Sequence, residues 1–300
     1  MFNYKLLRSF FAGLAISAVC IISCSKSDSP NGPGDEGDYL GQTPPGKQFV
    51  RFAPNIVPEA MYNSVTVSPD GQEIYWAASN GIKVTKKQDG RWTTPTIVSF
   101  SGKSTEEFYD DAPVISPDNK RLYFTSLRPC GSLQSGRWYG WYAERTTNGW
   151  SEPQPLPEVI NSGTIHWAVT LSNSGTLYFY NMTGGHSRIY LSKLTNGTYT
   201  TTEPLTVIND FADACAPFIA PDESYIIFTK LIHIQVGQWS YAPDGYYISF
   251  KGRDGQWQTP QKLTQFPDGE STFVTRDGKY IFCKGWWASA QIIEDYRPKN

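Results

Sequence analysis

The chain has 300 residues and a formal net charge of −2, from 26 Lys and Arg against 28 Asp and Glu. The positive charges form no run or stripe, which excludes a protein that holds nucleic acid through clustered Lys and Arg. Beyond the N-terminal segment the cysteines are Cys130, Cys215 and Cys283; three thiols allow at most one disulfide and exclude a disulfide scaffold.

The first 23 residues have the pattern of a bacterial lipoprotein signal. Lys5 and Arg8 precede a 13-residue apolar run at 10–22, which is too short to span a bilayer. The run ends in Ile-Ile-Ser-Cys, which resembles a lipobox with Cys24 as the lipidated residue; Cys20 is a weaker site because the bulky Val19 precedes it. We expect an outer-membrane lipoprotein of a Gram-negative cell, facing the periplasm or the cell surface. The alternative is a plain secretory signal or a membrane-retained stub.

Residues 24–46 follow as a predicted flexible tether. They are rich in Ser, Gly, Pro and Asp and have too little apolar surface to pack. The remaining residues, 47–300, are long enough for one all-β domain. No other stretch is long and apolar enough to cross a membrane.

An internal repeat defines this domain. Five copies of a phrase of the type Ser-Pro-Asp-Gly, followed by Leu/Ile-Tyr-Phe, place equivalent turn residues at Asp70, Asp118, Asn173, Asp222 and Asp277. Their spacings are 48, 55, 49 and 55 residues. A period near fifty with short strands between turns predicts a single β-propeller of five four-stranded blades.

Each repeat contains four strand signals. The innermost strand ends at the turn, and the second is the alternating aromatic and β-branched run. The third leads into an Asp-Gly or Asn-Gly hairpin turn in four repeats. The fourth carries an aromatic residue and then a proline, as an edge strand can: Pro95, Pro153, Pro204 and Pro260. The fifth repeat lacks this strand, so we expect residues 48–56 to return and close the ring there.

These motifs resemble the TolB-like propeller repeats, a WD-repeat-like class, over nearly all of residues 47–300. The resemblance implies a lipid-anchored or periplasmic propeller of a Gram-negative bacterium. A six-bladed TolB-like propeller is the alternative architecture. The sequence departs from the family pattern in the third repeat, which lacks Pro-Asp, and at two unusual linkers, 127–139 and 231–244.

The repeat also predicts a ring of side chains at one end of the central channel. Counting back seven positions from each turn residue gives the start of each innermost strand: Asn63, Asp111, His166, Cys215 and Glu270. The loops on the same face carry Trp138, Trp167 and Trp239, and also His186 and His233. All these residues can bind or titrate, so this channel mouth is the predicted ligand-binding face. The opposing interpretation is that these polar residues are only hydrated by solvent and bind no ligand.

The function expected from this pattern is a non-catalytic binding or scaffolding module for a protein or glycan ligand. The alternative is a carbohydrate-active enzyme in which Asp111 and Glu270 supply the carboxylate pair of a glycoside hydrolase. We find no phosphate-binding loop, nucleophile elbow, zinc-protease motif or calcium loop. The sequence therefore predicts no cofactor, no metal site and no nucleic-acid partner.

Overall fold

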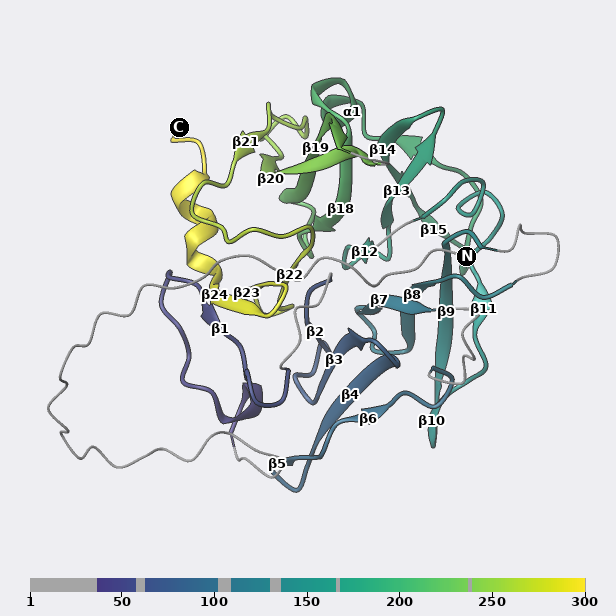
Figure 1. The fold of residues 1–300 in the computed structure, drawn as a ribbon, viewed down its shortest axis with the longest axis vertical. Coiled ribbons are helices and arrows are strands. Elements are labelled where there is room, and N and C mark those ends of the chain that lie inside the picture. Colours follow the sequence, from purple (N-terminus) through teal and green to yellow (C-terminus); the bar gives the residue numbers. More distant parts are fainter. Residues whose placement is uncertain are drawn as a thin grey trace, which may run out of the picture. The chain divides into compact units, whose positions relative to one another are not determined.

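The computed structural model describes residues 37–57, 63–101, 109–129, 136–165, 168–236 and 239–299. All of them belong to the compact unit formed by residues 31–300. The signal peptide and Cys24 lie outside the described residues. The described residues form five antiparallel sheets of four or five strands. Figure 1 shows them arranged in a ring around one axis, which confirms the predicted five-bladed propeller.

The blades follow one another in chain order. Each is given from its innermost to its outermost strand. Blade 1 contains β2 (Thr66–Val67), β3 (Glu73–Ala78), β4 (Gly81–Gln88) and β6 (Thr96–Ile97). Blade 2 contains β7 (Asp110–Ile115), β8 (Arg121–Ser126), β9 (Tyr139–Thr146) and β11 (Gln154–Pro155). Blade 3 contains β12 (Val169–Leu171), β13 (Leu177–Thr183), β14 (His186–Ser192) and β17 (Glu203–Pro204).

Blade 4 contains β18 (Ala214–Ile219), β19 (Tyr225–Val236), β20 (Trp239–Phe250) and β21 (Gln261–Lys262). A short helix, α1 (Thr206–Phe211), leads into it. Blade 5 contains β22 (Thr272–Val274), β23 (Tyr280–Cys283) and β24 (Trp286–Ser289), and the chain then turns into the 3₁₀ helix η2 (Ala290–Tyr296).

The ring closes as the sequence predicted. The N-terminal strand β1 (Val50–Arg51) pairs with β24, with Val50 opposite Trp287 and Arg51 opposite Trp286. Figure 1 shows the purple strand beside the yellow ones. Phe52 follows the strand and is fully buried, with its ring 5.0 Å from that of Phe282. Closure therefore joins the two ends of the domain by hydrogen bonds and by apolar packing.

The predicted fourth strand is divided into two pieces. In three blades the turn aromatic lies in a separate small hairpin strand, and the outermost strand begins after it. These short strands are β5 (Arg91–Trp92), β10 (Gly149–Trp150) and the pair β15 (Leu194–Thr195) and β16 (Thr198–Tyr199). Trp92, Trp150 and Tyr199 are buried, so these aromatics pack the blades.

Two boundaries predicted from the sequence were wrong. Residues 37–46 were assigned to the tether, yet Leu40 in η1 (Tyr39–Gly41) is 1% exposed and Tyr39 packs on Trp287. Residues 231–244 were treated as a linker, yet most of them extend β19 and β20 into a hairpin longer than those of the other blades. At residues 37–46 tertiary packing decides the structure, although the local composition is typical of a loop.

The Ser-Pro-Asp turns are explained by their own hydrogen bonds. The Ser68 hydroxyl donates to Asp70 Oδ1 at 2.6 Å, and the same carboxylate accepts the Gln72 N–H at 3.0 Å. Ser116 with Asp118 and Thr275 with Asp277 repeat the first bond at 2.6 Å. Asp222, whose repeat has Ala220 in place of the hydroxyl residue, keeps the bond that its carboxylate accepts from the Ser224 N–H. The repeated acid is therefore a structural turn residue.

The two described cysteines, Cys215 and Cys283, are buried free thiols, and Cys130 lies outside the described residues. Within the described ranges, no helix combines the length and apolar character needed to cross a membrane.

Candidate functional site

The propeller has two faces, which we name by their features. The mouth face is the one on which the innermost strands begin, and the turn face carries the Ser-Pro-Asp turns at the other end of those strands. The predicted ring lies at the start of the innermost strands. Asn63 and Asp111 are 3% exposed, Cys215 is 0% exposed, and Glu270 is partly buried. His166 and Trp167 lie outside the described residues, as does the side chain of Trp239.

Three of the described ring members act on a phenol that the sequence analysis did not identify. Tyr180 is fully buried in the middle of β13, and its pKa is raised, first by burial and then by the charges of Cys215, Glu270 and Asp111. Side chains from blades 2, 4 and 5 thus act on one hydroxyl group from blade 3. The repeat therefore places titratable groups from three other blades near one buried hydroxyl group.

Asp111 is a buried carboxyl of the ring with a raised pKa. Burial raises the pKa of its carboxyl to about 6, the nearby Asn63 amide and the Ala112 N–H oppose the rise, and Asp110 adds to it. The Ala112 N–H donates to Asp111 Oδ1 at 2.7 Å. No cation is among the groups that shift this pKa, so ionising Asp111 costs folding free energy.

The adjacent Asp110 shows the contrast. Its carboxylate receives Arg128 Nη2 at 2.7 Å on both oxygens and the hydroxyls of Ser101 and Ser126 at 2.8 and 2.7 Å. Asp110 is therefore a compensated structural ion pair. Asp111 has no such compensation.

A backbone irregularity follows the ring position in two blades. Ala112 and Ala216 have φ values of +50° and +46°, in the left-handed region, and the strand register shifts at both places. The sequence repeats Ala-Pro here, at Ala112-Pro113 and Ala216-Pro217. Non-glycine residues in this region are strained and recur near functional sites. The strain lies beside Asp111 and Cys215.

Glu270 completes the described ring from blade 5. Burial raises the pKa of its carboxyl, and the charge of Lys284 opposes this. Its backbone carbonyl accepts the Thr229 hydroxyl of blade 4 at 2.8 Å. Glycine is required just before it, because the Tyr246 hydroxyl occupies the place of a side chain at Gly269.

Several buried polar groups around the channel have no hydrogen-bond partner among the described residues. They are both polar atoms of the Asn63 amide and the hydroxyls of Ser64, Tyr180 and Thr272. Most groups buried to this degree in proteins are paired. The channel cavity, lined by innermost strands of all five blades, has a volume of about 30 Å³. It has room for about one water molecule, so a larger ligand cannot enter the channel.

The other predicted site residues differ in whether a ligand can reach them. Cys215 is packed in a hydrophobic cluster and its thiol pKa is raised by burial, so it exposes no surface to a ligand. Trp138 is partly exposed on the mouth face and packs edge-on against Tyr109, with 6.0 Å between the ring centroids. Of the three tryptophans predicted for the site, Trp138 is the one whose side chain is described, and a ligand can reach it.

A second column of the repeat would have identified the missed residues. Seven positions after the turn residue, the five copies carry Ala77, Thr125, Tyr180, Thr229 and Lys284. In blades 2 and 4 this position pairs directly with the ring residue, Thr125 with Asp111 and Thr229 with Cys215. Tyr180 and Lys284 stand out because they are large or charged where the others are small. That difference was the available signal.

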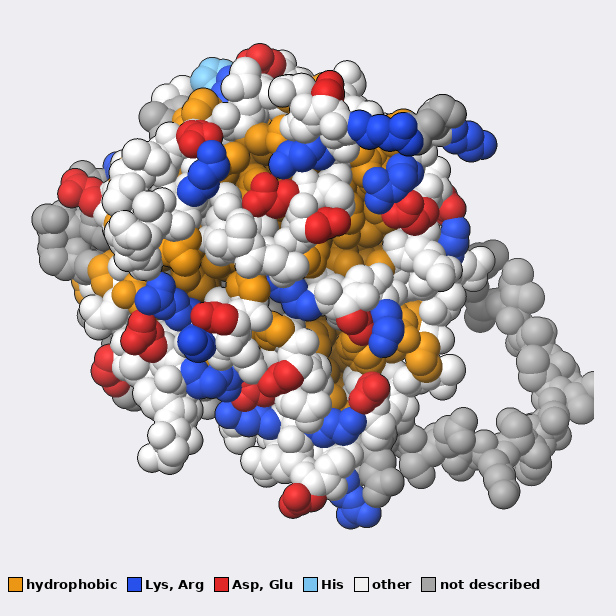
Figure 2. Space-filling view, turned by 180° about the vertical axis from the view of Figure 1, so that it is seen from behind, with side chains coloured by type: hydrophobic (Ala, Val, Ile, Leu, Met, Phe, Trp, Pro, Cys, Tyr) orange, Lys and Arg blue, Asp and Glu red, His pale blue; other side chains and the backbone are white. Residues whose placement is uncertain are grey.

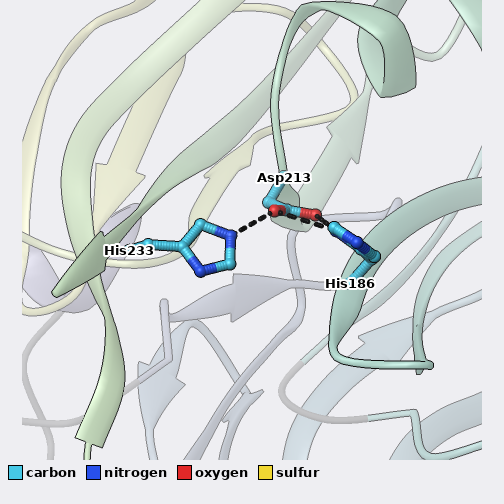
Figure 3. A group of neighbouring side chains, drawn as sticks. All are labelled: His186, Asp213 and His233. Atoms are coloured by element: carbon cyan, nitrogen blue, oxygen red, sulfur yellow. Dashed lines mark hydrogen bonds and ion pairs between the residues drawn. The ribbon is translucent and has the colours of Figure 1, made fainter. Parts of the chain in front are cut away.

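On the rim of the mouth face, two histidines meet one carboxylate (Figure 3). His233 Nε2 lies 2.9 Å from Asp213 Oδ2, and His186 Nδ1 lies 3.3 Å from Asp213 Oδ1. The sequence placed both histidines on this rim but did not identify Asp213. Burial acts to raise the pKa of Asp213, but hydrogen bonds from His233, the Ser187 N–H and His186, together with the charge of Arg188, lower it overall.

The surface charge fits the balanced composition. On the face shown in Figure 2, Lys and Arg side chains alternate with Asp and Glu, and no broad area of one sign is visible. This face offers no continuous basic path for a phosphate backbone.

No protein-family model and no curated protein matches the sequence. The solved structures that it resembles include TolB from Acinetobacter baumannii, with 18% identity and a TM-score of 0.46 over 73% of this chain and 47% of that one. A gluconolactonase from Xanthomonas campestris has 11% identity and a TM-score of 0.42 over 85% and 93%. A luciferin-regenerating enzyme has 11% identity and a TM-score of 0.45 over 85% and 92%. The chain spans less than half of the Acinetobacter protein. These likenesses concern the propeller fold, and we draw no functional argument from them.

Proposed function

We propose that this chain is a non-catalytic binding or scaffolding module of the cell envelope whose mouth face receives a protein or glycan ligand. The observation that carries the proposal is Asp111. It is a buried carboxyl with no cation among the groups that shift its pKa, which burial raises to about 6, and it lies beside the Asn63 amide. Groups held in such costly environments are typical of functional sites. A ligand that donates hydrogen bonds at the mouth offsets the cost.

The proposal favours binding over glycoside hydrolysis for two reasons. Neither Asp111 nor Glu270 is among the groups that shift the pKa of the other, as expected of carboxyls that do not work as a close pair. The channel volume of about 30 Å³ is also too small for a sugar ring. The exposed part of the site, including Trp138, suits a ligand that lies across the mouth.

The test compares Asp111→Asn with Asp118→Asn, the same substitution at a turn of the same blade on the opposite face. The full chain is probed with an array of envelope glycans and with muropeptide fragments, and both binding and turnover are measured. Ligand binding that weakens at least tenfold in Asp111→Asn but not in Asp118→Asn supports the module. Turnover that disappears in Asp111→Asn contradicts it and identifies an enzyme.

A protein ligand needs a second experiment in cells. A photo-crosslinking amino acid replaces Trp138 on the mouth face or Gln72 on the turn face. We expect one defined partner to crosslink from position 138 and none from position 72. Equal crosslinking from both positions contradicts the assignment of the mouth as the working face.

The membrane attachment is part of the same proposal. We assign it to lipidation of Cys24 and place the protein at the outer membrane of a Gram-negative cell, on the periplasmic or outer side. The support is the lipobox-like sequence before Cys24. Cys24→Ala should release the protein from the membrane fraction, and unchanged membrane association would refute the anchor.

A further inference from the structure

We propose that His186, Asp213 and His233 form a binding site for a divalent transition-metal ion, with Zn²⁺ as the ion they fit best. The site is separate from the channel ring, and the inference does not depend on the ligand proposed for that ring. It also departs from the sequence-based expectation of no metal site.

The donor set matches zinc chemistry. Two imidazole nitrogens and one carboxylate oxygen lie within 4.8 Å of one another. Imidazole and carboxylate are the common non-thiolate ligands of zinc in proteins. Tetrahedral bonds of about 2.0–2.1 Å place ligand atoms about 3.4 Å apart. The donors therefore need to approach by at most about 1.4 Å (4.8 − 3.4).

The two imidazoles are free to make that movement. The His186 and His233 side chains are 54% and 60% exposed, whereas the Asp213 side chain is only 8% exposed. Figure 3 shows both rings turned toward the carboxylate from opposite sides. The fixed ligand is therefore the carboxylate, and the adaptable ligands are the rings that face solvent.

Asp213 is already oriented for one metal bond. Its Oδ1 accepts the Ser187 N–H at 3.0 Å and Arg188 Nη1 at 3.1 Å, while Oδ2 faces His233. Outer partners of this kind hold a ligating carboxylate in place. Because Arg188 occupies Oδ1, the carboxylate offers Oδ2 as a single ligand atom. The positive charge of Arg188 also weakens the attraction for a cation, so we expect micromolar rather than nanomolar affinity.

The three ligands come from two blades. His186 begins β14 of blade 3, whereas Asp213 precedes β18 of blade 4 and His233 lies on the extended part of β19. The ring of His233 also packs on Tyr241 of β20, with 4.4 Å between the centroids. A bound ion would therefore join the long hairpin of blade 4 to blade 3. Three protein ligands leave a fourth position for water or a ligand group on the mouth face.

The experiment is a calorimetric titration of Zn²⁺ into the full chain, purified in detergent without a histidine tag, stripped with EDTA and kept reduced. We expect one ion per chain. The variants His186→Ala, His233→Ala and Asp213→Asn should each weaken binding at least tenfold. Glu203→Gln, which removes an exposed carboxylate paired with Lys193 in the same blade as His186, is the matched control and should bind like wild type.

Two further measurements keep the result interpretable if a variant folds poorly. Co²⁺ bound to wild type should give the visible spectrum of nitrogen and oxygen ligands, without the charge-transfer band of thiolate ligands. Mg²⁺ and Ca²⁺ should not compete, because both prefer oxygen ligands.

Three outcomes would overturn the proposal: no Zn²⁺ binding up to millimolar concentration, binding that both histidine variants retain, or a Co²⁺ spectrum dominated by thiolate. Melting temperatures that fall in the histidine variants while Zn²⁺ has no effect on wild type would also overturn it, and would identify a hydrogen-bonded latch between blades instead.

Discussion

The turns of one face and the channel ring of the other place their polar side chains in opposite environments. On the turn face, carboxylates are paired: Asp70, Asp118 and Asp277 close their own turns, and Glu73 of blade 1 binds Arg145 of blade 2 at 2.6 Å. On the mouth face, Asp111 is buried without a cation, and the Asn63 amide and the Tyr180 hydroxyl have no hydrogen-bond partner in the described chain.

The difference separates stability from function. On the turn face, Glu73, Asp118 and Asp277 have lowered pKa values, since hydrogen bonds and cations outweigh their burial. Asp111 and Glu270 on the mouth face have raised pKa values because burial dominates there. The turns therefore stabilise the propeller, whereas Asp111 and Glu270 of the channel ring are uncompensated groups of the kind found at binding sites.

The largest effect is expected on the turn face from Glu73→Ala. Glu73 is buried and also accepts the Tyr75 hydroxyl at 2.8 Å, so its removal takes the carboxylate partner from Arg145 and the acceptor from the Tyr75 hydroxyl. We expect a loss of roughly 3–5 kcal/mol in the free energy of unfolding, measured in urea at pH 7. Glu144→Ala removes an exposed partner of Arg121 and should cost less than about 1 kcal/mol.

The sign of the pH dependence follows from the lowered pKa of Glu73. The ionised Glu73 carboxylate contributes to the free energy of unfolding at pH values above 4.5, its ordinary pKa. This contribution is lost as the pH falls through the lower pKa of the folded state. Wild type and Glu73→Ala should therefore converge in acid. A difference that stays constant down to pH 3 would show that packing, rather than the ion pair, carries the effect.

The second prediction has the opposite sign and tests the mouth face. The folded-state pKa of Asp111 is raised from 3.8 to about 6. The protonated carboxyl therefore contributes fully to the free energy of unfolding only below pH 3.8, and this contribution is lost as the pH rises through about 6. Asparagine has no charge to bury. Asp111→Asn should therefore raise the free energy of unfolding at pH 8 by at most about 3 kcal/mol, at 1.36 kcal/mol per pKa unit, with little difference at pH 4.

Urea unfolding at the two pH values measures this gain. Asp118→Asn serves as the control, because its lowered pKa predicts a loss at pH 8 rather than a gain. If Asp111→Asn is destabilising at pH 8, Asp111 is a compensated structural residue and the contrast between the faces fails.

A smaller effect is expected from truncating one turn. Asp118→Ala removes the acceptor of the Ser116 hydroxyl and the Lys120 N–H, bonds of 2.6 and 3.1 Å. By analogy with the loss of a capping side chain, the cost is about 1 kcal/mol. Asp210→Ala, an exposed acid on α1, should leave the unfolding curve unchanged. Equal curves for the two variants would mean that backbone geometry alone maintains the turn.

The smallest effect is expected from His233→Ala in the presence of EDTA. The His233–Asp213 contact is on an exposed ring, and such pairs contribute about 0.5 kcal/mol or less without a metal. Thermal melting with and without EDTA measures the effect. A large loss in EDTA would show that the rim trio contributes to stability by itself, like the pairs of the turn face.

Particular residues show how far the sequence could be interpreted. The turn residues Asp70 and Asp118 and the aromatic run after each of them marked the blades, and the missing fourth strand of the last repeat predicted the pairing of β1 with β24. Counting from the turns also gave the register of Asp111, Cys215 and Glu270, which all act on Tyr180. The signal peptide, Cys24, His166 and Trp167 stay predictions, because they lie outside the described residues.

The sequence by itself determined the five-bladed architecture and the ring positions, because strand alternation, turn chemistry and a repeat length are local properties that recur along the chain. Only the tertiary structure decided which of these polar groups are buried and unpaired, since desolvation depends on neighbours from other blades. It also decided that Asp213 lies between His186 and His233, and that residues 37–46 pack on the domain. Those contacts join residues far apart in the chain, where no local pattern specifies the partner.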